Sequence, residues 1–182
     1  MPWLAQAEEA EVRLEGQAFE RRIRVAGREL VLNGTGIRAV AWFKGYAAAL
    51  YLPARASAEA EAVAMAGAKR LQLRMLQDVP AAEFVKAFDK GVARNVDAEA
   101  LPRLAERMAS FEARVSALGS VRKGDVVDLD HDPERGTLFS LNGKPRGEPI
   151  AGADFYAALL RSFVGAHPYD EKLKAGLLGR GL

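Results

Sequence analysis

Cysteine is absent from this chain of 182 residues, which excludes disulfides, thiolate metal sites and cysteine nucleophiles. Only two histidines occur, His131 and His167; they are not spaced as a pair of metal ligands, and both are expected in surface turns. Neither charge sign is in excess, because 26 basic and 24 acidic residues are interspersed and leave a net charge of +2. This balance gives no electrostatic footprint for nucleic acid. No apolar run approaches the roughly 18 residues that a membrane-spanning helix needs.

Sequence motifs for metal ions and nucleotide cofactors are missing as well. Asp128, Asp130 and Asp132 alternate as at the start of a calcium-binding loop, but Pro133 occupies the position at which that loop needs glycine. The glycines around Gly34 do not form a dinucleotide fingerprint, because no helix is expected after them. We therefore expect neither a metal site nor a cofactor.

The composition describes one globular domain with a separate N-terminus. Apolar residues make up 49% and charged residues 27% of the chain, which is typical of soluble globular proteins. We expect residues 11–182 to fold as a single domain and residues 1–10 to be the disordered end of a signal peptide. Ala5-Gln6-Ala7 has the small-x-small pattern of a cleavage site, which predicts export to the periplasm; the alternative is an ordinary frayed terminus.

The strongest local pattern lies in residues 32–53, which read LNGTGIRAVAWFKGYAAALYLP. Asn33-Gly34 predicts a turn at its start, since both residue types accept a positive φ at little cost. Residues 37–52 then lack Pro, Asp, Asn and Glu and are rich in β-branched and aromatic types. That composition predicts one long buried strand.

Cationic and phenolic side chains recur within this apolar strand. At the period of two that a strand imposes, Arg38, Lys44 and Tyr46 lie on the same side, unless a bulge near Gly45 shifts the register. These residues are the first candidates for a ligand site.

Arg38 needs a partner in such a strand, because arginine keeps its charge and an unpaired buried charge is strongly destabilising. One interpretation is an internal ion pair with an acid such as Glu29 or Asp78. The other is an anion clamp, in which the guanidinium and the Tyr46 hydroxyl bind a ligand inside an apolar cleft.

Shorter patterns predict the remaining elements. Strands are expected at residues 12–14, 19–25, 29–32, 69–76, 125–130 and 137–141. Helices are expected at residues 57–66 with Ser57 as N-cap, from Asp78 through an apolar stripe to Val92, and at residues 97–118, 154–164 and 170–178.

The strand at residues 69–76 alternates, which predicts one buried and one solvated face. The expected inward residues are Leu71, Leu73 and Met75, and the expected outward residues are Gln72 and Arg74. Strands first, helices next, then a hairpin and helices again indicate an α+β fold with a mostly antiparallel sheet.

The turn and strand of residues 32–53 resemble the chalcone isomerase superfamily, specifically its bacterial chalcone isomerase-like branch. Three further segments agree in order: RMLQDVPAAEFVKAFDKGV, LFSLNGKPRGEPI and FYAALLRSFVGAHPYDEKLKAGLLG. The resemblance covers residues 28–179. It implies an open-faced β-sandwich, in which a large antiparallel sheet has helices packed on one side and a cleft between.

The resemblance also implies a site. Plant chalcone isomerases add a phenolate to an enone within one molecule, and Arg38 matches the arginine that holds the nucleophilic oxygen. Tyr46 stands where the family has a strand threonine, and the later tyrosine, which would fall near residues 83–84, is missing. Ser162 falls where the family has Ser or Thr, and Lys90 roughly where it has Asn. Because stabilising the developing enolate carries this catalysis, the changes favour a member without isomerase activity.

We therefore expect a protein that binds a small apolar anion, a fatty acid or an aromatic acid, as other branches of the superfamily bind fatty acids through the corresponding arginine. The candidate ligand-binding residues are Arg38, Trp42, Lys44, Tyr46, Phe84, Lys90 and Ser162. One alternative is a weak or divergent isomerase of phenolic enones that uses Arg38 in the same cleft. Another is a cleft filled by side chains, which packing of Trp42 and Phe43 into it would indicate. We expect a monomer that neither binds nucleic acid nor spans a membrane.

Overall fold

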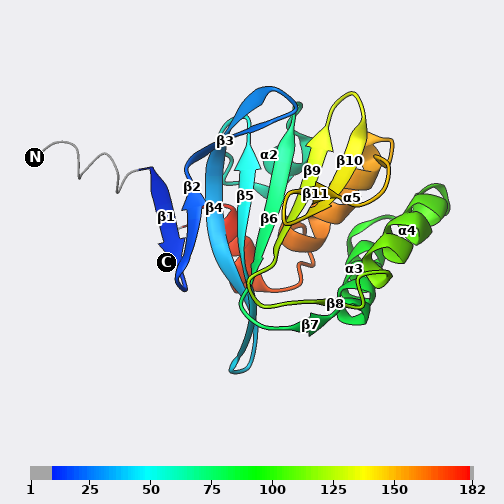
Figure 1. Cartoon of the computed structure of the whole chain (residues 1–182). Helices are drawn as coiled ribbons and strands as arrows, with labels where there is room; N and C mark the ends of the chain where they lie inside the picture. Colours follow the sequence, from blue (N-terminus) through cyan, green and yellow to red (C-terminus); the bar gives the residue numbers. More distant parts are fainter. Residues whose placement is uncertain (1–9, 181–182) are drawn as a thin grey trace, which may run out of the picture.

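A seven-stranded antiparallel sheet organises the molecule (Figure 1). The structure is a computed structural model that describes residues 10–180, so the suspected cleavage site Ala5-Gln6-Ala7 lies outside the described residues. In space the strands follow the order β11-β10-β9-β6-β5-β4-β3. Their bounds are β3 Arg22–Val25, β4 Arg28–Val40, β5 Phe43–Leu52, β6 Lys69–Met75, β9 Val126–Asp132, β10 Gly136–Leu141 and β11 Lys144–Pro145. Two small pairs are β1 Glu11–Leu14 with β2 Gln17–Glu20, and β7 Val79–Pro80 with β8 Ser120–Val121.

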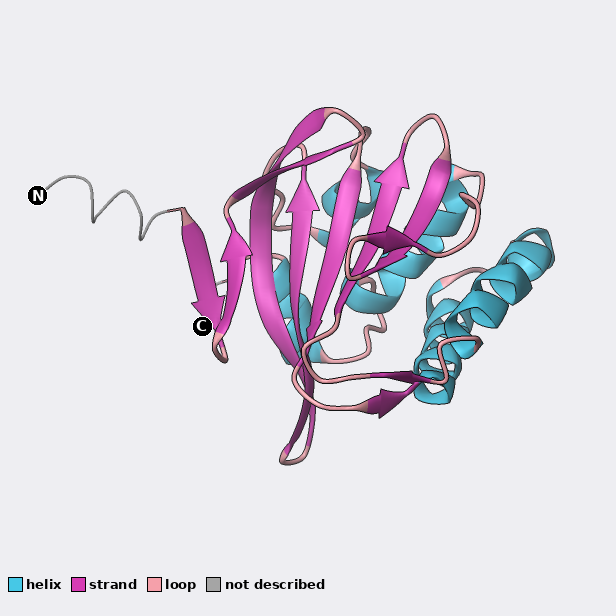
Figure 2. Cartoon of the chain, viewed as in Figure 1, coloured by secondary structure: helices cyan, strands magenta, loops and turns pink. Residues whose placement is uncertain are grey.

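Helices cover one face of this sheet. In Figure 1, α2, α5 and α6 lie behind the strands, whereas α3 and α4 form a pair to one side, next to β7 and β8. Their bounds are α2 Glu59–Ala64, α3 Ala81–Asn95, α4 Leu101–Ser116, α5 Ala153–Val164 and α6 Glu171–Leu177. The predicted α+β fold with a large antiparallel sheet is confirmed (Figure 2). Within residues 10–180, none of the helices combines the length and the hydrophobicity that crossing a bilayer requires.

The single strand predicted over residues 37–52 is wrong, because β4 and β5 are the two arms of a hairpin. The chain reverses at Ala41 and Trp42, and Ala41 adopts a left-handed conformation with φ of 53°. Alanine and tryptophan are not typical turn residues, so the sequence gives no signal for this reversal.

The turn predicted at Asn33-Gly34 is also wrong, since both residues lie within β4 at an irregularity in its pairing with β5. The buried Asn33 side chain donates to the carbonyl oxygens of Ala56 and Leu177 at 2.9 and 2.8 Å, and accepts from the Ala56 N–H at 2.8 Å. Gly34 is required by close approach, because a Cβ there would overlap the carbonyl oxygen of Gly176 in α6. This motif therefore docks the last helix.

Three helix starts differ from the prediction. The helix expected from residue 97 begins at Leu101, with Ala100 and not Asp97 at its N-cap position. The helix expected at residues 57–66 begins only at Glu59 and ends at Ala64, and Ser57 does not cap it. The helix expected from Asp78 begins at Ala81, because Val79 and Pro80 pair with β8 before the chain turns into α3.

The inward residues of β6 are confirmed: Leu71, Leu73 and Met75 are buried in the core on the helix side. The opposite face is not half-exposed at Gln72, which is buried and donates to Asp128 at 2.9 Å. β6 lies in the middle of the sheet between β5 and β9, so Gln72 and Arg70 find carboxylate partners on β9.

Candidate ligand-binding site

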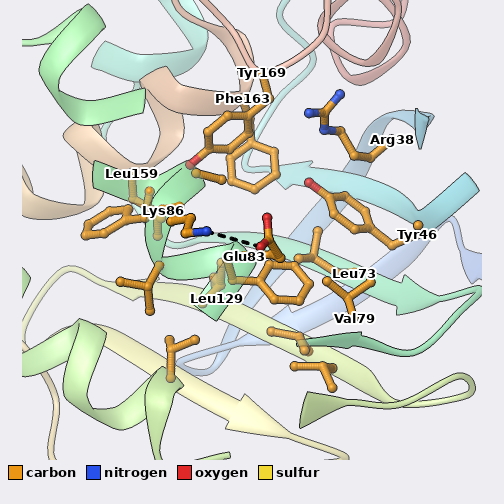
Figure 3. Close-up of a pocket in the computed structure, with 18 of the residues that line it drawn as sticks. Arg38, Tyr46, Leu73, Val79, Glu83, Lys86, Leu129, Leu159, Phe163 and Tyr169 are labelled. Carbon is orange, nitrogen blue, oxygen red and sulfur yellow. Dashed lines mark hydrogen bonds and ion pairs between the residues drawn. The ribbon is translucent and has the colours of Figure 1, made fainter. Parts of the chain in front are cut away.

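A cavity of about 540 Å³ lies between the sheet and the helix pair α3–α4 (Figure 3). Most of its lining is aliphatic or aromatic. The sheet contributes Leu73, Val127, Leu129 and Phe139, and the helices contribute Phe84, Phe88, Phe111, Val115, Leu159 and Phe163. An apolar pocket with a few polar groups is the usual form of a small-molecule site.

Arg38 and Tyr46 supply polar groups at one side of this cavity (Figure 3). They stand directly opposite each other on β4 and β5, so hairpin pairing brings the guanidinium and the phenol together. The Tyr46 ring stacks on Phe84, with ring centroids 6.1 Å apart. Burial raises the pKa of Tyr46, and the charge of Arg38 offsets that only in part, so the hydroxyl remains a neutral donor.

Arg38 is only loosely paired within the protein. Its Nη1 lies 3.6 Å from Oδ2 of Asp170, and the side chain is 30% exposed. The acids proposed from the sequence are not its partners: Glu29 pairs with Arg22, and Asp78 accepts from the backbone N–H of Lys123. A guanidinium has five N–H donors, so donors remain for a ligand oxygen.

Tyr169 is a second phenol in the cavity wall, and the sequence analysis missed it. It lies in the short segment between α5 and α6 and packs edge-to-face against Phe163, with centroids 5.0 Å apart. Burial raises the pKa of Tyr169 to about 12, whereas interaction with the Ser162 hydroxyl and the charge of Arg38 oppose the rise. The only available signal was an aromatic residue directly before the α6 N-cap, Asp170.

Comparison with known proteins agrees with this architecture. Residues 11–179 match the family model described as chalcone isomerase-like. The chain belongs to the chalcone isomerase-like family.

The crystal structure of a fatty-acid binding protein from Arabidopsis thaliana is similar to this chalcone isomerase-like chain, with a TM-score of 0.71. The two sequences are 15% identical, and the similarity covers 93% of this chain and 96% of the other. Identity this low establishes a common fold and nothing about the ligand. No curated protein matches the chain.

Lys44 and Trp42, both candidates from the sequence, lie outside the cavity of this family member. The bulge considered near Gly45 is present and shifts the register. Arg38 pairs with Tyr46 and the next residue, Ala39, pairs with Lys44, so Gly45 has no partner residue on β4. Lys44 accordingly pairs with Glu15 of the β1–β2 turn at 2.7 Å. Trp42 is 86% exposed at the hairpin tip.

The remaining candidates divide between the cavity and the core. Phe84 and Lys90 of α3 line the cavity. Ser162 does not; it is buried in α5, and its hydroxyl donates to the Ala158 carbonyl at 3.4 Å. Because the cavity is open, the hypothesis of a cleft filled by side chains is contradicted, although Phe43 does line it.

Glu112 of α4 places a carboxyl group in the cavity wall, which also carries Lys90 and the exposed Glu83–Lys86 ion pair of α3. Its Oε1 is buried and has no hydrogen-bond partner among residues 10–180. Burial, and then the nearby Asp89, raise the pKa of Glu112 to about 7. When Glu112 is protonated, its carboxyl O–H can donate a hydrogen bond to the Asp89 carboxylate, which gives the buried group a partner.

No group that could hold a metal ion is found in the described part of the chain. The aspartates that resemble a calcium loop have other partners, since Asp130 forms two hydrogen bonds to Arg70, at 2.7 and 2.8 Å, and Asp128 accepts from Gln72.

Proposed function

We propose that this protein binds a small apolar anion, a fatty acid or an aromatic acid, without chemically changing it. The carboxylate lies against the Arg38 guanidinium and the Tyr46 hydroxyl, and the apolar part fills the cavity. The observation that carries the proposal is the placement of Arg38 opposite Tyr46 at the edge of an apolar cavity of about 540 Å³.

The electrostatics of the site support an anion. The phenols of Tyr46 and Tyr169 are neutral near pH 7, and burial raises their pKa further, so both can donate to a carboxylate oxygen. Arg38 supplies the charge, and its only acidic partner within residues 10–180 lies 3.6 Å away. The apolar part of the ligand is supported by the lining of the cavity, most of which is aliphatic or aromatic.

The test compares dodecanoic acid with dodecanol, which has the same chain but no charge, by calorimetry. Arg38→Ala is expected to weaken the binding of dodecanoic acid about 10- to 100-fold, because a hydrogen bond to a charged group contributes roughly 1.5–3 kcal/mol. The variant should leave dodecanol binding nearly unchanged. Native mass spectrometry of protein purified without detergent should show a co-purifying acid in the wild type and not in the variant.

Arg13→Ala is the matched control, since Arg13 is an exposed arginine on β1 whose one ion-pair partner among residues 10–180 is Glu11. It should bind the acid as the wild type does. Equal affinities for acid and alcohol in the wild type would refute the anion clamp.

The runner-up function is a divergent isomerase of phenolic enones in the same cavity. Tyr169 favours it. The family tyrosine is missing from residues 83–84, and Tyr169 lines the same cavity as a second neutral hydrogen-bond donor. Cyclisation of a chalcone, followed by absorbance, should be lost in Arg38→Ala and in Tyr169→Phe if this function is present. Wild-type protein that leaves the chalcone unchanged would eliminate it.

We further propose that the protein belongs to the bacterial branch of its family and is exported. Export is supported by the sequence Ala5-Gln6-Ala7, which has the pattern of a cleavage site, and the branch by the resemblance of residues 32–53. Intact mass of protein recovered from the periplasm after expression of the full gene should correspond to cleavage after Ala7. A mass that retains these residues would contradict it.

A further inference from the structure

The helix-facing side of the sheet changes from apolar to polar at one end. Leu71, Leu129 and Phe139 form an apolar row across β6, β9 and β10. Two residues further along the same strands, Lys69, His131 and Thr137 form the next row, again in direct register. Side chains two apart on a strand share a face, so this polar row lies on the same side as the core.

The three residues of this polar row are buried although they carry polar groups. Lys69 is 4%, His131 8% and Thr137 1% exposed, so the expectation of a surface position for His131 is wrong. The His131 ring instead packs against Tyr156 of α5, with centroids 5.3 Å apart. The Nδ1 of His131 and the Oγ1 of Thr137 are buried without a hydrogen-bond partner among residues 10–180.

Lys69 has a similar deficit of partners. Its Nζ donates to the Val63 carbonyl at 2.8 Å, which uses one of three N–H donors. Within residues 10–180, no carboxylate lies at ion-pair distance from this ammonium group. Burial without a counter-charge lowers the pKa of Lys69 to about 8, and burial together with Lys69 lowers the pKa of His131.

Lys69 and His131 line a second cavity, of about 950 Å³, between α2, the end of α3 and α5. It shares no lining residue with the cavity that holds Arg38, and the core residues of α5 lie between the two. Charged groups are set among small apolar residues in its walls. The charged or titratable groups that line it are Glu59 of α2, Arg94 and Asp97 at the end of α3, and Asp154, Tyr156, Arg161 and His167 of α5 and the segment after it.

The balance of charge around this second cavity is positive. Two of its three acids are already neutralised, Glu59 by Lys174 and Asp154 by Arg107. Lys69, Arg94 and Arg161 form no ion pair with any residue from 10 to 180, and Asp97 is the one acid left. A buried cation beside unsatisfied polar atoms is destabilising unless a ligand supplies the missing partner.

We propose that this second cavity is a binding site for an oxyanion, a carboxylate or phosphate group, held at its floor by Lys69 and His131. The two free N–H groups of Lys69 donate to the anion oxygens, and the His131 ring donates when it is protonated. Arg94 and Arg161 attract the anion at the walls. Water can satisfy the hydrogen bonds of the floor, but only an anion also compensates the charge of Lys69.

The test is titration of the isotope-labelled full-length protein with inorganic phosphate and, separately, with sodium acetate at constant ionic strength, followed by NMR. Wild-type protein should show saturable shifts at His131 and Lys69. Lys69→Met should weaken binding about 10-fold or more, because it removes a charged donor and keeps the side-chain length. Lys123→Met, which changes an exposed lysine in the turn before β9, should bind as the wild type does.

The pKa of the His131 side chain is a second readout of binding. Bound anion favours the protonated imidazole, so saturating phosphate should raise the pKa of His131. Arg161→Met removes a positive charge from the cavity wall and should weaken binding several-fold, which keeps the proposal testable if Lys69→Met does not fold. Shifts that stay linear in phosphate and acetate, or that are equal in Lys69→Met and Lys123→Met, would show a cavity that holds water and refute the site.

Discussion

Asp170 has two roles that depend on its two carboxylate oxygens. Oδ1 accepts from the backbone N–H groups of Lys172 and Leu173, at 2.8 and 3.1 Å, and thereby caps α6. Oδ2 lies 3.6 Å from Arg38 Nη1. Asp170 therefore holds the last helix in place and at the same time competes with a ligand carboxylate for Arg38.

Asp170→Asn should tighten the binding of dodecanoic acid about 2- to 5-fold, since a partly exposed ion pair contributes up to about 1 kcal/mol and asparagine removes it. Asparagine is also a good N-cap, so α6 should keep its stability. Calorimetry gives the affinity. Asp154→Asn in the first turn of α5, where Asp154 pairs with Arg107, should leave this affinity unchanged. Weaker binding by Asp170→Asn would contradict competition for Arg38.

Glu112 predicts a dependence of stability on pH. The folded protein holds the Glu112 proton up to about pH 7, whereas the unfolded chain loses it near its ordinary pKa of 4.5. The folded state therefore binds more protons between these values, and the free energy of unfolding contributed by Glu112 falls as pH rises from about 4.5 to 7.

Glu112→Gln should remove this fall and make the protein more stable than the wild type above pH 7. Urea unfolding at several pH values, with the exposed Glu106→Gln of the same helix as control, measures the difference. If the free energy of unfolding changes with pH in the same way in wild type and Glu112→Gln, then Glu112 is not the group responsible.

The sequence singled out residues whose chemistry conflicts with their neighbours, and their role as ligand-binding residues stays a prediction. Arg38 and Tyr46 stand out within an apolar stretch, and the structure places both at one cavity. Tyr169 and Lys69 did not stand out, because their surroundings are made by segments far away in the sequence. His131 was expected at the surface for the same reason: Tyr156, which covers it, lies in α5.

At the scale of elements, the β4–β5 hairpin determines the geometry of the first cavity. The reversal at Ala41 places Arg38 opposite Tyr46, and the bulge at Gly45 turns Lys44 to the other face. Alternation at a period of two is read equally well as one long strand or two short ones when no turn residue separates them. The class of fold could therefore be predicted, whereas the pairing of these strands could not.

The crossing of β4 and α6 is the second element-level feature, and it predicts the effect of adding one methyl group. Gly34→Ala should lower the free energy of unfolding by about 3 kcal/mol or more, because the new Cβ overlaps backbone atoms of α6 that cannot rotate away. Gly45→Ala is the matched control, since its Cβ would lie 3.7 Å from the nearest atoms. It should change stability by about 1 kcal/mol or less. Urea denaturation compares them, and equal losses would contradict the close approach.

At the scale of the whole molecule, the cavity of about 540 Å³ limits the size of its ligand. Affinity should rise about 4-fold for each CH₂ added to a straight-chain acid, because each buried CH₂ contributes roughly 0.8 kcal/mol, until the cavity is full. Ala87→Phe on α3 should move the best chain length to a shorter acid, since Ala87 lines the cavity. Calorimetry over an acid series measures the optimum. An optimum unchanged by Ala87→Phe would place the chain elsewhere.

The Asn33 side chain joins positions 144 residues apart, and this has a consequence for biosynthesis. A ribosome has already released β4 from its exit tunnel long before it makes Leu177. Until then, the amide of Asn33 lacks its second acceptor and the glycine backbone beside it has no helix to cover it. The sheet that carries Arg38 therefore reaches its final form only after α6 is synthesised, and shorter nascent chains expose this backbone to chaperones.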